Sequence, residues 1–329
     1  MTGGDGGGPG PGSGRAMDIY RRPVMVILEA LAAALCYAVA SVFQQNGAAQ
    51  APIEDALRVS LLLGLVRRPV WIIGIVADVL GFLLQFLALG HGSLVLVQPL
   101  LVCGLLFALP LGAAMTDRRW LTGREWFGSG VVVAGLALFL VVANPAPGAA
   151  TTSGLAWVIV SLTTLVPALL LTLASVRAAP AVAATLQATG AGFLYGLAAA
   201  FTRTVAHLAT AGPGSAGHTL IQVMATWQTY GLLAVGIGSL LLSQTAFQGG
   251  PLGWSLPALS AVDPVVSIVI GALAFSEPIR SDPLGVAAET VGLGLMLGGI
   301  LLLNRLRLGL APAGVGESGE TGVSGTGSG

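Results

Sequence analysis

The chain has 329 residues, of which 55% are hydrophobic and only 9% are charged, whereas about a quarter of the residues are charged in a typical soluble domain. This composition indicates a membrane protein, and we expect the lipid bilayer to be one of its partners. Its formal net charge is zero, so it offers no basic surface for nucleic acid, and we expect no nucleic-acid partner.

The chain begins and ends with tails rich in small and turn-forming residues. Residues 1–22 and 305–329 form these tails, and their Gly, Pro and Ser content predicts disorder. Residues 23–304 form the predicted transmembrane domain. Its first apolar stretch, from Val24 to Phe43, is too long for a signal-peptide core and lacks a clear cleavage site after it, so we expect it to remain in the mature protein.

Nine segments are mostly apolar over about the 20 residues that a helix needs to cross the hydrocarbon core. Because a backbone in lipid must satisfy its own hydrogen bonds, we expect these segments to be helices. The predicted fold class is therefore an all-α polytopic membrane protein. The segments are 24–45, 70–89, 93–114, 126–143, 155–173, 181–203, 227–248, 254–275 and 284–303.

The second half of the chain partly repeats the first at an offset of 158 residues. Matched positions include Tyr37 with Tyr195 and Pro99 with Pro257. The offset holds across four successive spans, which predicts two related halves at about 24–143 and 181–303, joined by a linking helix at about 155–173. Two related halves are typical of a transporter.

The arginines indicate the orientation, because cytoplasmic loops are enriched in positive residues. With nine spans, nine of the fourteen arginines lie inside together with the C-terminus. A tenth crossing by residues 53–66 would raise this count to eleven. That segment is short and charged at its start, which suits an interfacial helix, and opposite orientations of the first spans of the two halves require nine. We favour nine helices in two inverted repeats, with ten as the alternative.

Four of the fourteen acidic residues fall within spans, namely Glu29, Asp78, Asp263 and Glu289. An acid at a helix centre costs about 2.5–3.5 kcal/mol on insertion, so such residues usually face a cavity or a partner. Asp78 is the deepest and shares one helical face with Gln85 and two glycines, which let another helix approach. It either lies on a substrate or ion path, with proton coupling as a further hypothesis, or hydrogen-bonds a neighbouring helix.

Two other spans contain a proline beside a polar residue. Pro264 follows Asp263, and we expect the helix to bend or break there. Transporters often place their sites at broken helices, although a plain kink stabilised by the aspartate fits equally well. Gln98 and Pro99 form a second interruption, in the third span. Glu289 lies near one end of its span, and we expect it to reach the membrane interface.

The first span carries several polar residues on one side. Glu29, Tyr37 and Gln44 fall within an arc of about 120° at 100° per residue. Tyr195 matches Tyr37 in the second half, so a central cavity lined by both halves would bring the two tyrosines to related places. Tyrosines near a membrane interface are also common without any function.

The residues that other functional classes need are missing. The three histidines have no metal-ligand spacing, and Cys36 and Cys103 lie singly inside apolar spans as small packing groups. All fourteen basic residues are arginine, so no GKS or GKT phosphate-binding loop occurs. We therefore expect neither an enzyme nor a cofactor, which leaves secondary transport.

Five stretches carry a resemblance to a known family. They are SVFQQNGA at 41–48, VWIIG at 70–74, LLQFLALGHGSLVLVQPL at 83–100, residues 117–147 ending in ANPAP, and AFSEP at 274–278. Together they resemble the drug/metabolite transporter (DMT) superfamily, EamA-like, and most nearly its NIPA-type magnesium-transporter branch. The resemblance covers about residues 24–303 and implies nine helices, an external N-terminus and magnesium as the solute.

The sequence thus predicts a multi-pass secondary transporter of the cell membrane with a cytoplasmic C-terminus. Its substrate would be a small metabolite, a drug or a divalent cation such as Mg²⁺, moved by alternating access. The sequence leaves open whether two copies form a homodimer. The alternative is a non-transporting membrane scaffold or partner subunit. No catalytic residue is expected, and the candidates for the substrate or ion path are Glu29, Tyr37, Gln44, Asp78, Gln85, Gln98, Tyr195, Asp263 and Glu289.

Overall fold

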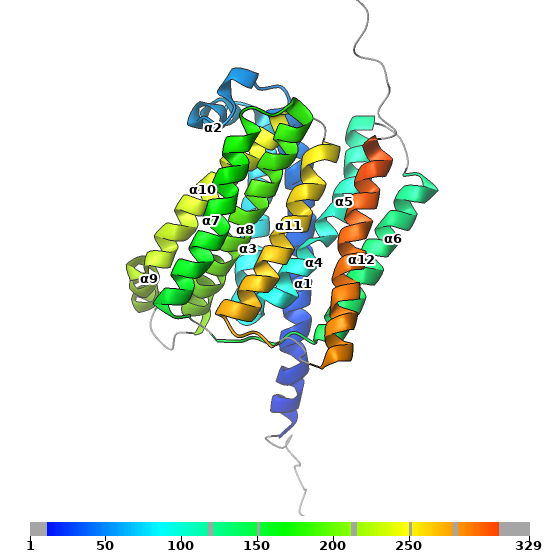
Figure 1. Ribbon diagram of the computed structural model, residues 1–329. Helices are drawn as coiled ribbons and strands as arrows, with labels where there is room; N and C mark the ends of the chain where they lie inside the picture. Colours follow the sequence, from blue (N-terminus) through cyan, green and yellow to red (C-terminus); the bar gives the residue numbers. More distant parts are fainter. Residues whose placement is uncertain are drawn as a thin grey trace, which may run out of the picture.

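Long helices lie side by side in the computed structural model of the chain (Figure 1). The structure describes residues 12–117, 121–149, 152–211, 216–249, 252–278 and 282–308, and within these ranges it contains helices and their connections but no strand. Eight of the helices are long and apolar enough to cross a membrane. The part of the chain that is described is therefore an all-α polytopic membrane protein, as the composition predicts.

The first half of the bundle contains three short helices, α2, α4 and α5, besides the long ones. Its elements are α1 (Gly12–Ala48), the 3-10 turn η1 (Ile53–Asp55), α2 (Val59–Leu65), α3 (Pro69–His91), α4 (Leu94–Leu101), α5 (Cys103–Gly112), the π-helical turn η2 (Ala113–Asp117) and α6 (Gly123–Ala143). The expected third span consists of two helices, because α4 and α5 are separate.

The second half begins after the single helix α7. The remaining elements are α7 (Gly154–Ser175), α8 (Pro180–Ala211), α9 (Ala216–Ala225), α10 (Trp227–Gln248), α11 (Leu252–Ala274) and α12 (Pro283–Leu308). Eight of the expected spans coincide with the eight apolar helices. The expected span 254–275 falls on α11, whose apolar part is the shorter segment Ala258–Ala274.

Local residues explain where several helices begin and end. Ser93 and Ser153 accept hydrogen bonds from the backbone at the starts of α4 and α7, and Thr122 forms a capping box with Glu125 at the start of α6. Asn144 ends α6 in the left-handed conformation, with φ of 42°, which asparagine tolerates better than most residues. These polar residues satisfy backbone groups that a helix end leaves unpaired.

The helices pack in pairs, and small residues bring two of the pairs together. α1 packs along α3, α6 along α12, and α8 against α10 and α11. A Cβ atom added at Gly74 of α3 would lie 2.9 Å from the backbone nitrogen of Gln44 on α1, and one added at Gly135 of α6 would lie 2.4 Å from that of Met296 on α12. The close approach expected on the Asp78 face of α3 is therefore confirmed.

The segment 53–66 does not cross the bundle. Its helix α2 has seven residues, which span only about 10 Å, against about 30 Å for the hydrocarbon core. Leu61 and Leu65 instead pack with Trp71 and Phe247. In Figure 1 this segment lies at one end of the bundle, which we call the α2 end, and α9 lies at the opposite end, which we call the α9 end.

The two expected interruptions differ from each other. α11 is helical from Leu252 to Ala274, so the expected break at Pro264 does not occur, whereas the alternative, a bend at the proline, stays a prediction. A proline removes one backbone hydrogen bond, and packing against neighbouring helices allows a membrane helix to continue past it. The interruption at Gln98 and Pro99 is confirmed three residues further on, where the Val102 amide bonds the Pro99 carbonyl in a tighter turn between α4 and α5.

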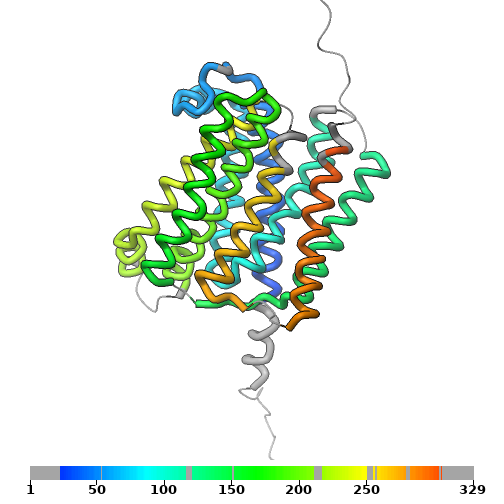
Figure 2. The backbone as a smooth tube through the Cα atoms, in the orientation of Figure 1, coloured from blue at the N-terminus to red at the C-terminus, as the bar shows by residue number. Residues whose placement is uncertain are grey.

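The expected tails lie mainly outside the described residues, which begin at residue 12 and end at residue 308. Residues 12–22 and 305–308 belong to α1 and α12 instead. Figure 2 traces the backbone and shows that α6 and α12 form one side of the bundle, whereas α7 and α10 lie on the other. The helices between them enclose the site described next.

Candidate functional site

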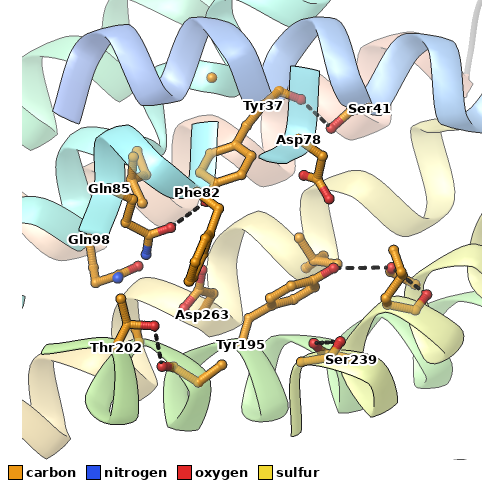
Figure 3. Close-up of a pocket in the computed structure, with 18 of the residues that line it drawn as sticks. Tyr37, Ser41, Asp78, Phe82, Gln85, Gln98, Tyr195, Thr202, Ser239 and Asp263 are labelled. Atoms are coloured by element: carbon orange, nitrogen blue, oxygen red, sulfur yellow. Dashed lines mark hydrogen bonds between the residues drawn. The ribbon is translucent and has the colours of Figure 1, made fainter. Parts of the chain in front are cut away.

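A cavity of about 810 Å³ lies inside the bundle, lined by residues of α1, α3, α4, α5, α8, α9, α10 and α11. Both halves of the chain therefore contribute to its wall. Its volume lies within the range of about 300–1,000 Å³ that is typical of small-molecule sites. Most of the lining side chains are aliphatic or aromatic, with a small number of polar groups among them (Figure 3).

Seven of the nine candidate residues line this cavity. They are Tyr37, Gln44, Asp78, Gln85, Gln98, Tyr195 and Asp263. These residues come from α1, α3, α4, α8 and α11 and are separated by up to 226 positions along the chain (263 − 37). The structure thus gathers them around one space, while their contact with a substrate stays a prediction.

The other two candidates do not line the cavity. Glu29 is partly buried on α1, close enough to His91 for an electrostatic interaction, and its Oε2 atom makes no hydrogen bond within the described part of the chain. Glu289 is only 6% exposed on α12. The expected interfacial exposure of Glu289 is therefore wrong, because α12 packs closely along α6.

Two carboxyl groups provide the charge of the cavity wall. Asp78 extends from α3 beside the Gln44 side chain, and Asp263 extends from α11, where its Oδ1 atom accepts a hydrogen bond of 3.2 Å from Ser267. Figure 3 shows both carboxyl groups in the same space. Among the described residues that line the cavity no other side chain is charged, so no arginine or histidine there balances them.

The polar groups around the carboxyl groups differ in how well they are satisfied. The Tyr37 hydroxyl donates to Oε1 of Gln85, and the Tyr195 hydroxyl lies 3.3 Å from the Ser243 hydroxyl. Gln98, by contrast, is only 1% exposed, and neither its amide nitrogen nor its amide oxygen has a partner in the described structure. A buried polar group without a partner costs about 1–3 kcal/mol, so Gln98 calls for an explanation by function.

Neutral hydrogen bonds connect three helices at the α2 end of the cavity. Gln244 Nε2 of α10 donates to Gln44 Oε1 of α1 over 2.6 Å, and Trp71 Nε1 of α3 donates to Gln244 Oε1 over 3.0 Å. All three side chains are buried. We call this group the amide network. Of its residues only Gln44 was predicted from the sequence. Gln244 could have been found as well, because an amide inside an apolar span is itself a sign of a buried polar contact.

A buried ion pair lies toward the α9 end. Arg203 Nη1 of α8 is 2.9 Å from Oε1 of Glu277, which follows α11, and the two side chains are 4% and 0% exposed. The Glu277 carboxylate also accepts hydrogen bonds of 2.9 and 2.8 Å from the amides of Leu94 and Val95 in the first turn of α4. A helix N-terminus favours an anion, so this group, which we call the ion-pair clamp, joins α8, α4 and the end of α11.

The guanidinium group of Arg203 has further partners. It donates to the carbonyls of Gly92 and Ala149 over 2.7 and 3.3 Å and lies 5.0 Å from the centre of the Phe275 ring. Burial raises the pKa of Glu277, and Arg203 and the two α4 amides act in the opposite direction. In the sequence Arg203 is one of the fourteen arginines that indicate orientation, and the visible hint of its pairing is the AFSEP stretch, which contains Glu277.

Comparison with known proteins identifies a relative but no function. The chain is 28% identical over 290 residues to an uncharacterised protein of Corynebacterium glutamicum, and the similarity covers 86% of this chain and 95% of that protein. No family model matches the chain, and no solved structure matches it either. The similarity therefore covers most of both chains.

Proposed function

We propose that the protein is a secondary transporter of the DMT type that moves a small solute through the central cavity by alternating access. The observation that carries this proposal is a single cavity of about 810 Å³ that is lined by both halves of the chain and contains two carboxyl groups from membrane helices. Ionisable residues inside membrane helices are expensive to insert, and they commonly mark substrate or ion paths.

The proposal includes nine crossings in two inverted repeats. It is supported by helix pairs that recur at the sequence offset: α1 packs on α3 as α8 packs on α10, and α1 packs on α4 and α5 as α8 packs on α11. The described chain starts at the α9 end and finishes at the α2 end (Figure 1), as an odd number of crossings requires. Binding between inverted repeats near the midplane is common in secondary transporters.

The proposal also assigns the α2 end to the cytoplasm, with the C-terminus of α12 on that side. Positive residues are enriched in cytoplasmic loops. The arginines at the α2 end are Arg58, Arg67, Arg68, Arg124, Arg177 and Arg305. The amide network would then close the cavity toward the cytoplasm, and the ion-pair clamp would hold the external end.

The test is transport by the purified full chain in liposomes. The panel contains labelled metabolites, organic cations and Mg²⁺, each measured with and without a proton gradient. We expect saturable uptake of at least one solute above empty liposomes, and loss of that uptake in Asp78→Asn/Asp263→Asn with the folded fraction unchanged by size-exclusion chromatography. Glu54→Gln, an exposed acid outside the cavity, is the matched control.

A membrane scaffold makes the opposite prediction for the same measurement. It would show no flux for any solute, and the aspartate variants would change only assembly. A proton gradient that changes the flux of wild type but not that of Asp78→Asn would place proton coupling at Asp78.

A further inference from the structure

The charge of the cavity restricts the class of ligand that it can hold. Its two charged lining side chains, among the described residues, are both aspartates. An anion placed there would meet carboxylates and no cation, whereas a cation would offset the high cost of holding a carboxylate away from water. The charge distribution therefore favours a positively charged ligand.

The walls restrict the ligand further. Figure 3 shows the rings of Phe82 and Tyr195 in the same space as the two carboxyl groups, with Tyr37 on the facing helix. The hydroxyl of Tyr37 is bound to Gln85, and that of Tyr195 lies next to Ser243. Because both hydroxyl groups have partners, the aromatic rings are the parts of these residues that can contact a ligand. Aromatic faces attract cations. Burial of a ligand's apolar surface against the aliphatic remainder of the wall favours binding.

A bare metal ion fits this cavity poorly. Mg²⁺ needs close octahedral coordination by oxygen and gives up its water reluctantly, and leucine and aromatic side chains cannot replace that water. In the described part of the chain no group of three or more His, Cys, Asp or Glu residues could hold a metal ion. The cavity volume of about 810 Å³ instead suits a molecule of drug size.

The Gln98 side chain supplies an independent sign of a ligand. It lines the cavity, is 1% exposed and has two amide atoms without partners in the described structure. A ligand that carries hydrogen-bonding groups as well as a charge would satisfy these atoms.

We propose that the cavity binds amphipathic organic cations: an ammonium or similar cationic centre pairs with Asp78 and Asp263, an apolar body lies against Phe82 and Tyr195, and a polar N–H or O–H group reaches Gln98. This inference rests on the proposed function, because it names the substrate class of the same cavity. It departs from the magnesium ion that the sequence resemblance implies.

The test compares two ions of nearly equal shape and opposite charge. Tetraphenylphosphonium and tetraphenylborate are titrated into the purified full chain in detergent, and binding is followed by equilibrium dialysis. We expect saturable binding of the phosphonium ion and at least about tenfold weaker binding of the borate ion, a difference that corresponds to about 1.4 kcal/mol. Equal affinities for the two ions would overturn the inference, and this comparison needs no variant.

Variants then locate the charge and the hydrogen bond. Asp78→Asn/Asp263→Asn should weaken phosphonium binding at least about tenfold, whereas Glu54→Gln should leave it unchanged. Gln98→Leu should weaken binding of 4-(4-aminobutyl)phenol, whose hydroxyl group can reach Gln98, but not that of 4-phenylbutylamine, whose only polar group is the ammonium that pairs with the aspartates. Phosphonium binding that survives the double aspartate change in folded protein would contradict the proposed site.

The binding and transport measurements can fail separately. Saturable phosphonium binding without flux of any solute in liposomes would retain the ligand class and reject the transporter. Flux of Mg²⁺ or of an anion, without phosphonium binding, would retain the transporter and reject the organic cation.

Discussion

At the α2 end of the cavity α1, α3 and α10 are joined by the neutral hydrogen bonds of Gln44, Trp71 and Gln244, whereas at the α9 end the charged pair of Arg203 and Glu277 joins α8 to the start of α4. Removing one partner of a buried neutral hydrogen bond costs about 1–3 kcal/mol. Removing one partner of a buried ion pair costs about 3–5 kcal/mol. We therefore expect the two ends to resist opening to different degrees, with the α2 end opening more readily.

The largest expected effect comes from breaking the ion-pair clamp on one side. Glu277→Gln leaves the guanidinium group of Arg203 buried without its carboxylate, so we expect a loss of about 3–5 kcal/mol of stability. Thermal unfolding of the purified protein in detergent measures it as a lower Tm. The double change Arg203→Gln/Glu277→Gln should recover part of the loss, because no unpaired charge remains.

Glu54→Gln is the control for the loss of a carboxylate, since Glu54 is exposed. If Glu277→Gln and Glu54→Gln unfold at the same temperature, the clamp is not a stabilising element and the contrast between the two ends disappears.

A smaller effect is expected when the positive charge at position 203 is kept and the planar guanidinium group is removed. Arg203→Lys can still pair with Glu277, but an ammonium group cannot also reach both the Gly92 and Ala149 carbonyls in the geometry of a guanidinium. We expect a loss of about 1.5–3 kcal/mol, the value of a hydrogen bond to a charged group, again read from the Tm. A loss as large as that of Glu277→Gln would show that the hydrogen bonds matter more than the charge.

Much of this site could be predicted because the bilayer makes polar residues conspicuous. Apolar length alone gave the positions of eight helices, since membrane thickness sets the length of a span. Asp78, Asp263 and Gln98 stood out as polar residues inside these spans, and the structure gathers them around one cavity.

The clamp escaped prediction because its residues lie where charges are ordinary. Arg203 falls at the end of the expected span, and only the longer helix α8, which continues to Ala211, buries it. Glu277 lies beyond α11, and its pairing with a residue 74 positions away (277 − 203) depends on tertiary packing. At Pro264 a local rule predicted a bend or a break, and α11 continues through the proline without a break because neighbouring helices can support it.

The amide network should matter less for stability than the ion-pair clamp and more for access of water-soluble molecules to the cavity. Gln244→Leu leaves the Gln44 carbonyl and the Trp71 N–H without their partner, so we expect a loss of about 1–3 kcal/mol. In a background without the two native cysteines, Cys36 and Cys103, a cysteine in place of Ser41 should react faster with a membrane-impermeant maleimide when Gln244 is replaced. A cysteine in place of Thr202, which also lines the cavity, should keep its rate.

The smallest effect is expected at Trp71, and it isolates one bond of the amide network. Trp71→Phe removes the N–H that donates to Gln244 but keeps an aromatic ring among Leu61, Leu65 and Phe247. Only one buried acceptor, the Gln244 carbonyl, then lacks its donor, so the loss should lie near the lower end of about 1–3 kcal/mol, and the maleimide rate at position 41 should rise less than in Gln244→Leu. A loss equal to that of Glu277→Gln would mean that both ends are held equally firmly, so that nothing in the structure favours opening at the α2 end.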